Sequence, residues 1–501
     1  MTGHRATMQD APLDDIAGAA AATAQPFAAT EPRKRAQALV DLADALERSA
    51  AELIATAMRE TGLAEPRLQG ELRRTSNQLR LFAEVVVEGA YLDARIDEAD
   101  PDYVIGPRPD VRRMLQPVGP VLNFAASNFP FAFSVIGGDS AAALAAGCPV
   151  ILKANPGHPE LSAQTAALVI DSLAASGMPN GVFQVVFGQE VGVALLRDGR
   201  IRAGSFTGST RVGRMLAEIA ATRDVPIPFF GELGSVNPAY ATAGAFRDEP
   251  GLIAGFLASV SGSAGQLCTK PGFLFLPAGV EVGDLAPFAP TSEHRLLNPG
   301  IGSTFARRRG EVLAVPGVTV HLAGTVRETD DGQRFATPTV VEVTTEQLEA
   351  NDILLEECFG PLSIIVRFRE AAELAPLHRR LFPGNLTSTL HATETELESG
   401  EWAALITELA ATSGRVLFAG WPTGVSVTSA MQHGGPSPAT TTDATSVGTA
   451  AIGRFLRAVA YQDAPAAALP KPLRDDNPWN VPQRRSTAGL SSGWGSLDGR
   501  Y

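Results

Sequence analysis

The sequence is poor in cysteine, with only three such residues among 501. Three thiols cannot build a disulfide framework, and Cys148, Cys268 and Cys358 lack the close paired spacing of a zinc site. This usage is typical of a reducing compartment, so we expect a cytoplasmic protein without a structural metal. Buried packing is the common role of such residues, but any one of the three is a candidate nucleophile.

Long apolar runs and excess positive charge are also missing. No apolar stretch reaches the roughly 18 residues of a membrane span, and the N-terminus lacks the apolar core of a signal peptide. The formal net charge is −13, which argues against nucleic-acid and anionic-membrane partners. Hydrophobic residues make up 45% and charged residues 19% of the chain, as in globular proteins, and the length predicts two or three domains.

The glycine-rich GxGxxG fingerprint of dinucleotide-binding domains is absent, but the strand and helix pattern of such a domain is present. Between about 118 and 235, short apolar runs alternate with amphipathic segments, which predicts a parallel sheet with crossover helices. Helices are expected near 134–146, 159–176 and 210–222, and over 33–62, where Gly62 supplies a stop. The predicted strands are PVGPVLNF, CPVILKA, FQVVFG, IRAGSFTG and IPFFGEL.

A second group of strand-like runs follows, which predicts a second α/β domain from about 235 to 430. These runs are GFLFLP, PLSIIVRF, LTSTLHA and RVLFAG. From residue 465 the chain is rich in proline, glycine and charge, and it forms either an arm packed on a partner subunit or a frayed tail.

Four motifs carry a family resemblance. They are NFAASNFP from Asn123, FGELGSVNP from Phe230, GQLCTKP from Gly265 and ECFGP from Glu357. In order and separation this set resembles the aldehyde dehydrogenase superfamily, over nearly the whole chain from about residue 30. The resemblance implies an α/β fold with a Rossmann-type NAD(P)-binding domain, a catalytic domain and a small oligomerisation arm, assembled as a homodimer or homotetramer. The corresponding ranges are 1–234 for the NAD(P)-binding domain with an arm excursion near 103–117, 235–430 for the catalytic domain, and 431–501 for the return to the cofactor domain and the C-terminal oligomerisation segment.

The chemistry of aldehyde oxidation fits the residues in these motifs. Hydride transfer from an aldehyde first requires a tetrahedral adduct, and a thiolate such as Cys268 makes that adduct and then holds the acyl group as a thioester. The resemblance implies the Asn128 side-chain amide and the Cys268 backbone N–H as oxyanion donors. It also implies Glu232 as the base that activates water for thioester hydrolysis. The apolar residues around Glu232 predict a raised pKa for its carboxyl group.

The candidate cofactor residues lie at the ends of predicted strands. Lys153 ends CPVILKA, at the carboxyl edge where nucleotides bind in α/β sheets, and Gly208 and Ser209 open a helix whose N–H groups can hold phosphate. The resemblance implies that Lys153 contacts the adenosine ribose or its 2′-phosphate and that Ser209 contacts the pyrophosphate. It further implies Glu357 at the nicotinamide ribose and Phe359 near the nicotinamide ring.

The cofactor preference depends on Pro156. NAD-preferring relatives often carry a glutamate there, and its loss removes repulsion against a 2′-phosphate. Pro156 also lacks the hydroxyl that some NADP-preferring relatives place there. We therefore expect NADP or NAD as cofactor, with a leaning toward NADP.

The C-terminal third narrows the resemblance to one subgroup. GWPTGV from Gly420, MQHGGP from Met431 and TSVGT from Thr445 resemble α-ketoglutaric semialdehyde (2,5-dioxopentanoate) dehydrogenases and a related NADP-dependent fatty-aldehyde dehydrogenase. These segments border the active-site entrance in that subgroup. His433 is therefore expected to touch substrate or cofactor, or to tune Cys268, although a lone histidine in a glycine-rich loop is commonly structural.

The leading hypothesis is oxidation of α-ketoglutaric semialdehyde to 2-oxoglutarate, and the main alternative is a medium- or long-chain fatty aldehyde. A substrate carboxylate would need a cation, for which Arg295, Arg454 and Arg457 are available. Glu232 argues for thioester hydrolysis and against transfer to CoA. A thiol hydrolase built on Cys268, His433 and Asn128 would leave Glu232 unexplained. The intact catalytic set also disfavours a silent binding protein.

Overall fold

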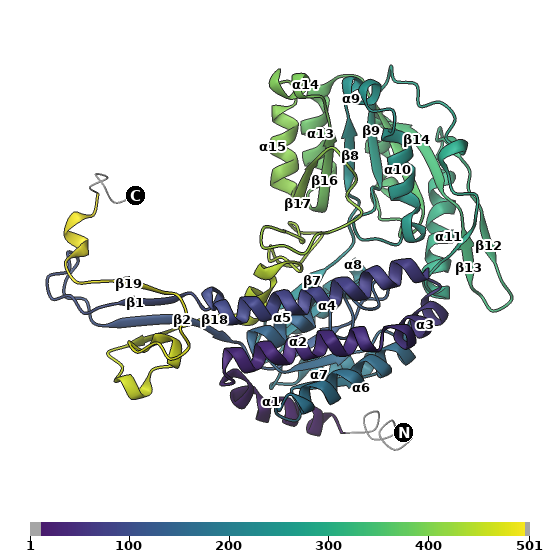
Figure 1. The fold of residues 1–501 in the computed structure, drawn as a ribbon. Helices are drawn as coiled ribbons and strands as arrows, with labels where there is room; N and C mark the ends of the chain where they lie inside the picture. Colours follow the sequence, from purple (N-terminus) through teal and green to yellow (C-terminus); the bar gives the residue numbers. More distant parts are fainter. Residues whose placement is uncertain (1–11, 496–501) are drawn as a thin grey trace.

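A computed structural model describes residues 12–495, and it contains two α/β units and an extended arm (Figure 1). The first unit contains a parallel five-stranded sheet in the order β5-β4-β3-β6-β7. All five strands lie within the apolar runs predicted for this region. They are β3 (Val121–Phe124), β4 (Val150–Lys153), β5 (Phe183–Val186), β6 (Ala203–Thr207) and β7 (Phe229–Glu232).

Helices cover the first sheet, and α5, α6 and α8 confirm the three crossover helices expected from the sequence. The segment 33–62 is divided at Ser49, where φ −95° and ψ 6° leave the helical region, so the expectation of one helix is wrong there. Gly62 ends the second helix at φ 71°, as expected. The helices of this unit are α1 (Leu13–Ala28), α2 (Pro32–Arg48), α3 (Ala50–Thr61), α4 (Glu65–Glu88), α5 (Gly138–Ala146), α6 (Pro159–Ala175), α7 (Gln189–Arg197) and α8 (Thr210–Thr222).

The second unit is built on a seven-stranded sheet in the order β11-β14-β15-β9-β8-β16-β17, in which β11 alone is antiparallel to its neighbour. The four strands predicted here are confirmed as β9, β15, β16 and β17. The strands are β8 (Pro238–Ala241), β9 (Phe273–Pro277), β11 (Thr319–Leu322), β14 (Thr339–Thr344), β15 (Leu362–Phe368), β16 (Asn385–His391) and β17 (Ser413–Phe418). A small antiparallel sheet adds β10 (His294–Arg295), β12 (Val326–Glu328) and β13 (Arg334–Ala336). The helices are α9 (Ala243–Asp248), α10 (Leu252–Ser261), α11 (Pro299–Leu313), α12 (Thr345–Ala350), α13 (Leu374–Leu381), α14 (Glu394–Glu398) and α15 (Ala403–Thr412).

The arm is a four-stranded sheet that projects to one side of both units (Figure 1). It joins distant parts of the chain, in the order β18 (Leu456–Gln462), β2 (Val111–Pro117), β1 (Ala94–Asp97) and β19 (Gln483–Ser486). The C-terminal segment therefore adds an edge strand to the arm, while residues 496–501 lie outside the described part. Among residues 12–495, no helix combines the length and the apolarity needed to cross a membrane.

The two units meet where the chain passes from the first sheet to the second. Glu232 is the last residue of β7, and β8 begins at Pro238. The returning segment crosses the same junction, because Thr440 pairs with Glu232 in an isolated antiparallel bridge. Side chains from both sheets and from the return segment therefore converge at one place.

Candidate active site

Cys268 lies in a tight loop between α10 and β9. The backbone before it is unusual, because Ser263 and Ala264 adopt φ values of 51° and 53°, a region that residues with a side chain rarely enter. Gly265 follows at φ 65°, and a Cβ there would lie 2.3 Å from the carbonyl oxygen of Gly360. The turn that presents Cys268 therefore requires glycine at position 265.

Asn128 lies against this same turn. Its Nδ2 donates to the carbonyl oxygen of Gln266 at 3.1 Å, and Arg67 of α4 holds the Asn128 carbonyl oxygen at 2.7 Å. On the other side, Asn237 Nδ2 donates to the Cys268 carbonyl oxygen at 2.8 Å. The structure therefore brings Asn128 to the Cys268 loop, and its role as an oxyanion donor stays a prediction because the amide is bonded to protein here.

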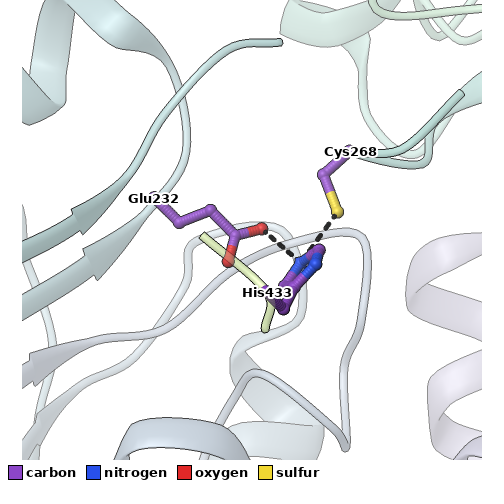
Figure 2. A group of neighbouring side chains, drawn as sticks. All are labelled: Glu232, Cys268 and His433. Carbon is purple, nitrogen blue, oxygen red and sulfur yellow. Dashed lines mark hydrogen bonds and ion pairs between the residues drawn. The ribbon is translucent and has the colours of Figure 1, made fainter. Parts of the chain in front are cut away.

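Three side chains that could exchange protons meet at the junction. His433 Nε2 lies 3.7 Å from Cys268 Sγ and 3.1 Å from Glu232 Oε1, as Figure 2 shows. Ser446 Oγ donates to the other carboxylate oxygen at 2.9 Å, and the backbone N–H of His433 donates to Thr445 Oγ1 at 2.9 Å. The side chains of His433 and Glu232 are 1% and 2% exposed, so bulk water does not screen them. Of the contacts expected for His433, the structure contains the one with Cys268, and an effect of His433 on the reactivity of that thiol stays a prediction.

The electrostatics of this cluster correct one expectation. Burial favours a raised pKa for Glu232, but the charge of His433 and hydrogen bonds from His433 and Ser446 outweigh it and lower the pKa to about 2. Burial and the neighbouring Glu232 carboxylate raise the pKa of the Cys268 thiol well above its ordinary value. The thiol therefore needs a proton acceptor before it can attack, and His433 Nε2 is within reach.

The candidate cofactor residues lie at the carboxyl edge of the first sheet and around the start of α8. Ser209 directly precedes α8, and its side chain makes no capping bond, so the first N–H groups are free for a phosphate. Glu357 lies beside this helix start, because a Cβ on Gly234 would meet Glu357 Oε2 at 2.7 Å and Thr210 Oγ1 at 2.9 Å. Burial raises the pKa of the Glu357 carboxyl to about 7.

Lys153 provides the strongest indication of an anionic cofactor. It ends β4, it is 8% exposed, and burial lowers the pKa of its ammonium group. Its ammonium group makes no side-chain hydrogen bond or ion pair with another residue of the range 12–495, which is costly for a largely buried cation. A ribose or phosphate at this edge would supply the missing acceptor. Gly208 lies nearby on the β6–α8 turn, and Phe359 packs partly buried against the core of the first unit.

Of the three arginines available in the sequence for a substrate carboxylate, two bond to other residues and the third lies on the arm. Arg295 donates to the carbonyl oxygens of Arg59 and Glu60, each at 3.1 Å. Arg454 forms a buried ion pair with Asp139 at 2.9 Å, and Arg457 is exposed on β18 of the arm.

Arg74 of α4 is a cation that the sequence reasoning missed. Its guanidinium lies 5.3 Å from the ring centre of Phe133, whose ring centre is 6.3 Å from that of His433. Its Nη1 is buried without a hydrogen-bond partner in the described part of the chain. The nearest carboxylate on the same helix face, Glu71, is engaged by Arg67 at 2.9 Å and by two backbone N–H groups. No sequence motif marks Arg74, because its helical neighbours do not show that it lacks a partner.

Comparisons with known proteins identify the family. The model of the aldehyde dehydrogenase family matches residues 2–282. Alpha-ketoglutaric semialdehyde dehydrogenase 2 of Azospirillum brasilense is 41% identical, with 92% of this chain and 88% of that protein covered. Alpha-ketoglutaric semialdehyde dehydrogenase of Acinetobacter baylyi is 39% identical, with 94% and 90% covered.

Solved structures share the fold. Lactaldehyde dehydrogenase from Escherichia coli superposes with a TM-score of 0.76 at 20% identity, and the alignment covers 90% of this chain and 91% of that one. A 1-pyrroline-5-carboxylate dehydrogenase from Thermus with bound NAD superposes with a TM-score of 0.74 at 21% identity, covering 90% and 85%. The chain belongs to the aldehyde dehydrogenase family and is an NAD(P)-dependent oxidoreductase that acts on aldehydes.

Proposed function

We propose that the protein oxidises α-ketoglutaric semialdehyde to 2-oxoglutarate, the activity in the names of its two relatives near 40% identity. The observation that carries this substrate is the unpaired Arg74 guanidinium near the Cys268 cluster. Burial lowers the pKa of Arg74, and negative charge at Glu71, Cys268 and Glu232 raises it, so the guanidinium is within electrostatic reach of the reacting groups. A short aldehyde with a carboxylate satisfies this cation, whereas an alkyl chain leaves it unpaired.

Oxidation begins with proton transfer inside the cluster. When His433 is neutral, the Cys268 thiol passes its proton to Nε2, and the Glu232 carboxylate stabilises the imidazolium that forms through the same attraction that lowers the pKa of Glu232. The thiolate then attacks the aldehyde carbon, and the adduct oxygen accepts hydrogen bonds from the Asn128 amide and the Cys268 N–H. NAD(P), when bound, supplies the acceptor for the hydride that this adduct releases. The product on the protein is a thioester of Cys268.

Hydrolysis of the thioester returns the thiol. His433 first releases its proton to solvent, which leaves the Glu232–His433 pair free to accept a proton from water. The hydroxide so formed attacks the acyl carbon, the C–S bond breaks, and the Cys268 sulfur takes a proton back. The pair acts as one base because the Glu232 carboxylate, 3.1 Å from Nε2, stabilises the charge that His433 gains when it takes the proton from water.

Replacing Arg74 with glutamine tests the substrate. We expect kcat/KM for 2,5-dioxopentanoate to fall roughly 10- to 100-fold, because a hydrogen bond to a charged group contributes about 1.5–3 kcal/mol. Turnover of hexanal, which has no carboxylate, should change little. The matched control is Arg73→Gln, since Arg73 is the exposed neighbour on the same helix. Wild-type turnover that is faster with hexanal and longer aldehydes than with 2,5-dioxopentanoate would reject the proposed substrate.

The cofactor preference is proposed to lean toward NADP, and Pro156 supports it. Pro156 is exposed in the turn after β4, three residues beyond Lys153. Pro156→Glu should raise KM for NADP about tenfold relative to KM for NAD, because a carboxylate repels the 2′-phosphate and can bond the ribose hydroxyls. Pro156→Gln separates charge from backbone effects. Equal changes with both cofactors would refute the role of this position.

The arm supports a homo-oligomer, which we also propose. Its sheet projects to one side of the first α/β unit (Figure 1), and its own core is small, with six buried apolar residues. A sheet of this kind gains stability by packing on a second copy. Sedimentation should therefore give the mass of a dimer or tetramer, and a monomer at micromolar concentration would contradict the assembly.

The three cysteines are unpaired, which supports the cytoplasm as the proposed location.

A further inference from the structure

The cluster at the junction contains the three ligand types that zinc prefers in proteins. Cys268 offers a thiolate, His433 an imidazole nitrogen and Glu232 a carboxylate oxygen. The three ligand atoms lie within 4.8 Å of one another, and theirs is the one such convergence of three among residues 12–495. Sequence spacing gives no sign of it, because the residues come from β7, the loop before β9 and the return segment.

The distances suit a tetrahedral ion. Bond lengths of about 2.3 Å to sulfur and about 2.0 Å to nitrogen and oxygen require roughly 3.6 Å between sulfur and nitrogen and roughly 3.3 Å between nitrogen and oxygen. The structure has 3.7 Å between Cys268 Sγ and His433 Nε2, and 3.1 Å between that nitrogen and Glu232 Oε1. The third pair of atoms is Cys268 Sγ and a Glu232 carboxylate oxygen, which lie within 4.8 Å of each other. Rotation of the Glu232 side chain would bring them to the distance that zinc requires.

We infer that Cys268, His433 and Glu232 form an inhibitory binding site for Zn²⁺. Binding breaks the S–H bond of Cys268, forms a Zn–S bond and releases one proton to solvent. The thiolate and the carboxylate then neutralise the two charges of the ion. Its fourth position is left for water, as in zinc sites with three protein ligands.

The surroundings suit a reversible inhibitory site. Ser446 Oγ already orients Glu232 through its second carboxylate oxygen at 2.9 Å. His433 Nδ1, in contrast, has no hydrogen-bond partner among the described residues, and an unsupported imidazole weakens metal binding. Zinc here would occupy the nucleophile and its proton acceptors together. That consequence for activity rests on the proposed function, whereas the binding does not.

Two readouts separate these parts. Co²⁺, as a spectroscopic substitute for Zn²⁺, should give a near-ultraviolet thiolate-to-metal band in the purified full-length enzyme, and Zn²⁺ should suppress that band by competition. Zn²⁺ should also inhibit NAD(P)H formation and slow alkylation of Cys268 by iodoacetamide, and EDTA should reverse both effects. A band with no aldehyde activity in any assay would keep the metal site and reject the proposed function.

Variants decide whether the cluster holds the metal. Cys268→Ala should abolish the band, and His433→Asn should weaken Zn²⁺ affinity by more than about 100-fold, beyond the loss of an outer-shell partner. Cys148→Ala should change nothing, nor should His321→Asn, which removes a His–Glu pair of 2.8 Å that includes no thiol. Absence of the band in the wild type, or its persistence in Cys268→Ala, would overturn the inference. If His433→Asn fails to fold, Glu232→Gln takes its place with the same expected loss of affinity.

Discussion

Cys268→Ala is expected to reduce the NAD(P)H-linked oxidation of 2,5-dioxopentanoate by roughly 10⁴-fold or more, the scale of losing a covalent nucleophile. Without the thiolate no tetrahedral adduct forms, so the aldehyde carbon has no hydride that it can readily release. The measurement is the absorbance of NAD(P)H at saturating aldehyde. It should show neither a burst nor steady turnover.

Cys148→Ala is the matched control for this variant. Cys148 is fully buried, its Sγ lies 3.4 Å from the carbonyl oxygen of Phe455, and burial raises its pKa to about 11. A thiol in this setting is a packing residue, so kcat should stay near that of the wild type even if the melting temperature falls. Full activity in Cys268→Ala, or equal losses in both variants, would remove Cys268 from the mechanism.

The strands and crossover helices of both units could be predicted from the sequence, because their signals are local. Each strand of the first sheet is a short apolar run, and α8 begins directly after Ser209, as the turn signal indicates. The division at Ser49 was missed since the apolar spacing continues through it. The β1–β19 pairing lay beyond such reasoning because it joins segments nearly 400 residues apart.

The candidate site, too, could be predicted from the sequence only in part. Cys268 and Glu232 could be named from motifs, and the structure brings them together. The pKa of Glu232 was predicted in the wrong direction, because its apolar sequence neighbours are visible in the chain whereas His433, which stabilises its charge, comes from 201 positions away. Arg74 carries no motif at all. What distinguishes it is the absence of a partner, which only a three-dimensional structure can reveal.

From the buried contact between Glu232 and His433 we expect the two residues to limit different steps. Both Cys268 Sγ and Glu232 Oε1 face the same nitrogen, so His433 can take the thiol proton while the carboxylate holds the resulting charge. After the acyl group occupies the sulfur, that nitrogen is left with Glu232 as its one acidic neighbour in the cluster. Hydrolysis then depends on the carboxylate more strongly than the first attack does.

Glu232→Gln is therefore expected to slow steady-state turnover roughly 10²- to 10³-fold, the usual worth of a general base, while a burst of one NAD(P)H per active site persists. Stopped-flow absorbance separates the two phases. Ser446→Ala is the control, because it removes the 2.9 Å hydrogen bond to Oε2 but leaves the carboxylate, and its turnover should stay within about tenfold of the wild type. Slow turnover without a burst would assign Glu232 to thiol activation, and unchanged turnover would leave water activation to His433 alone.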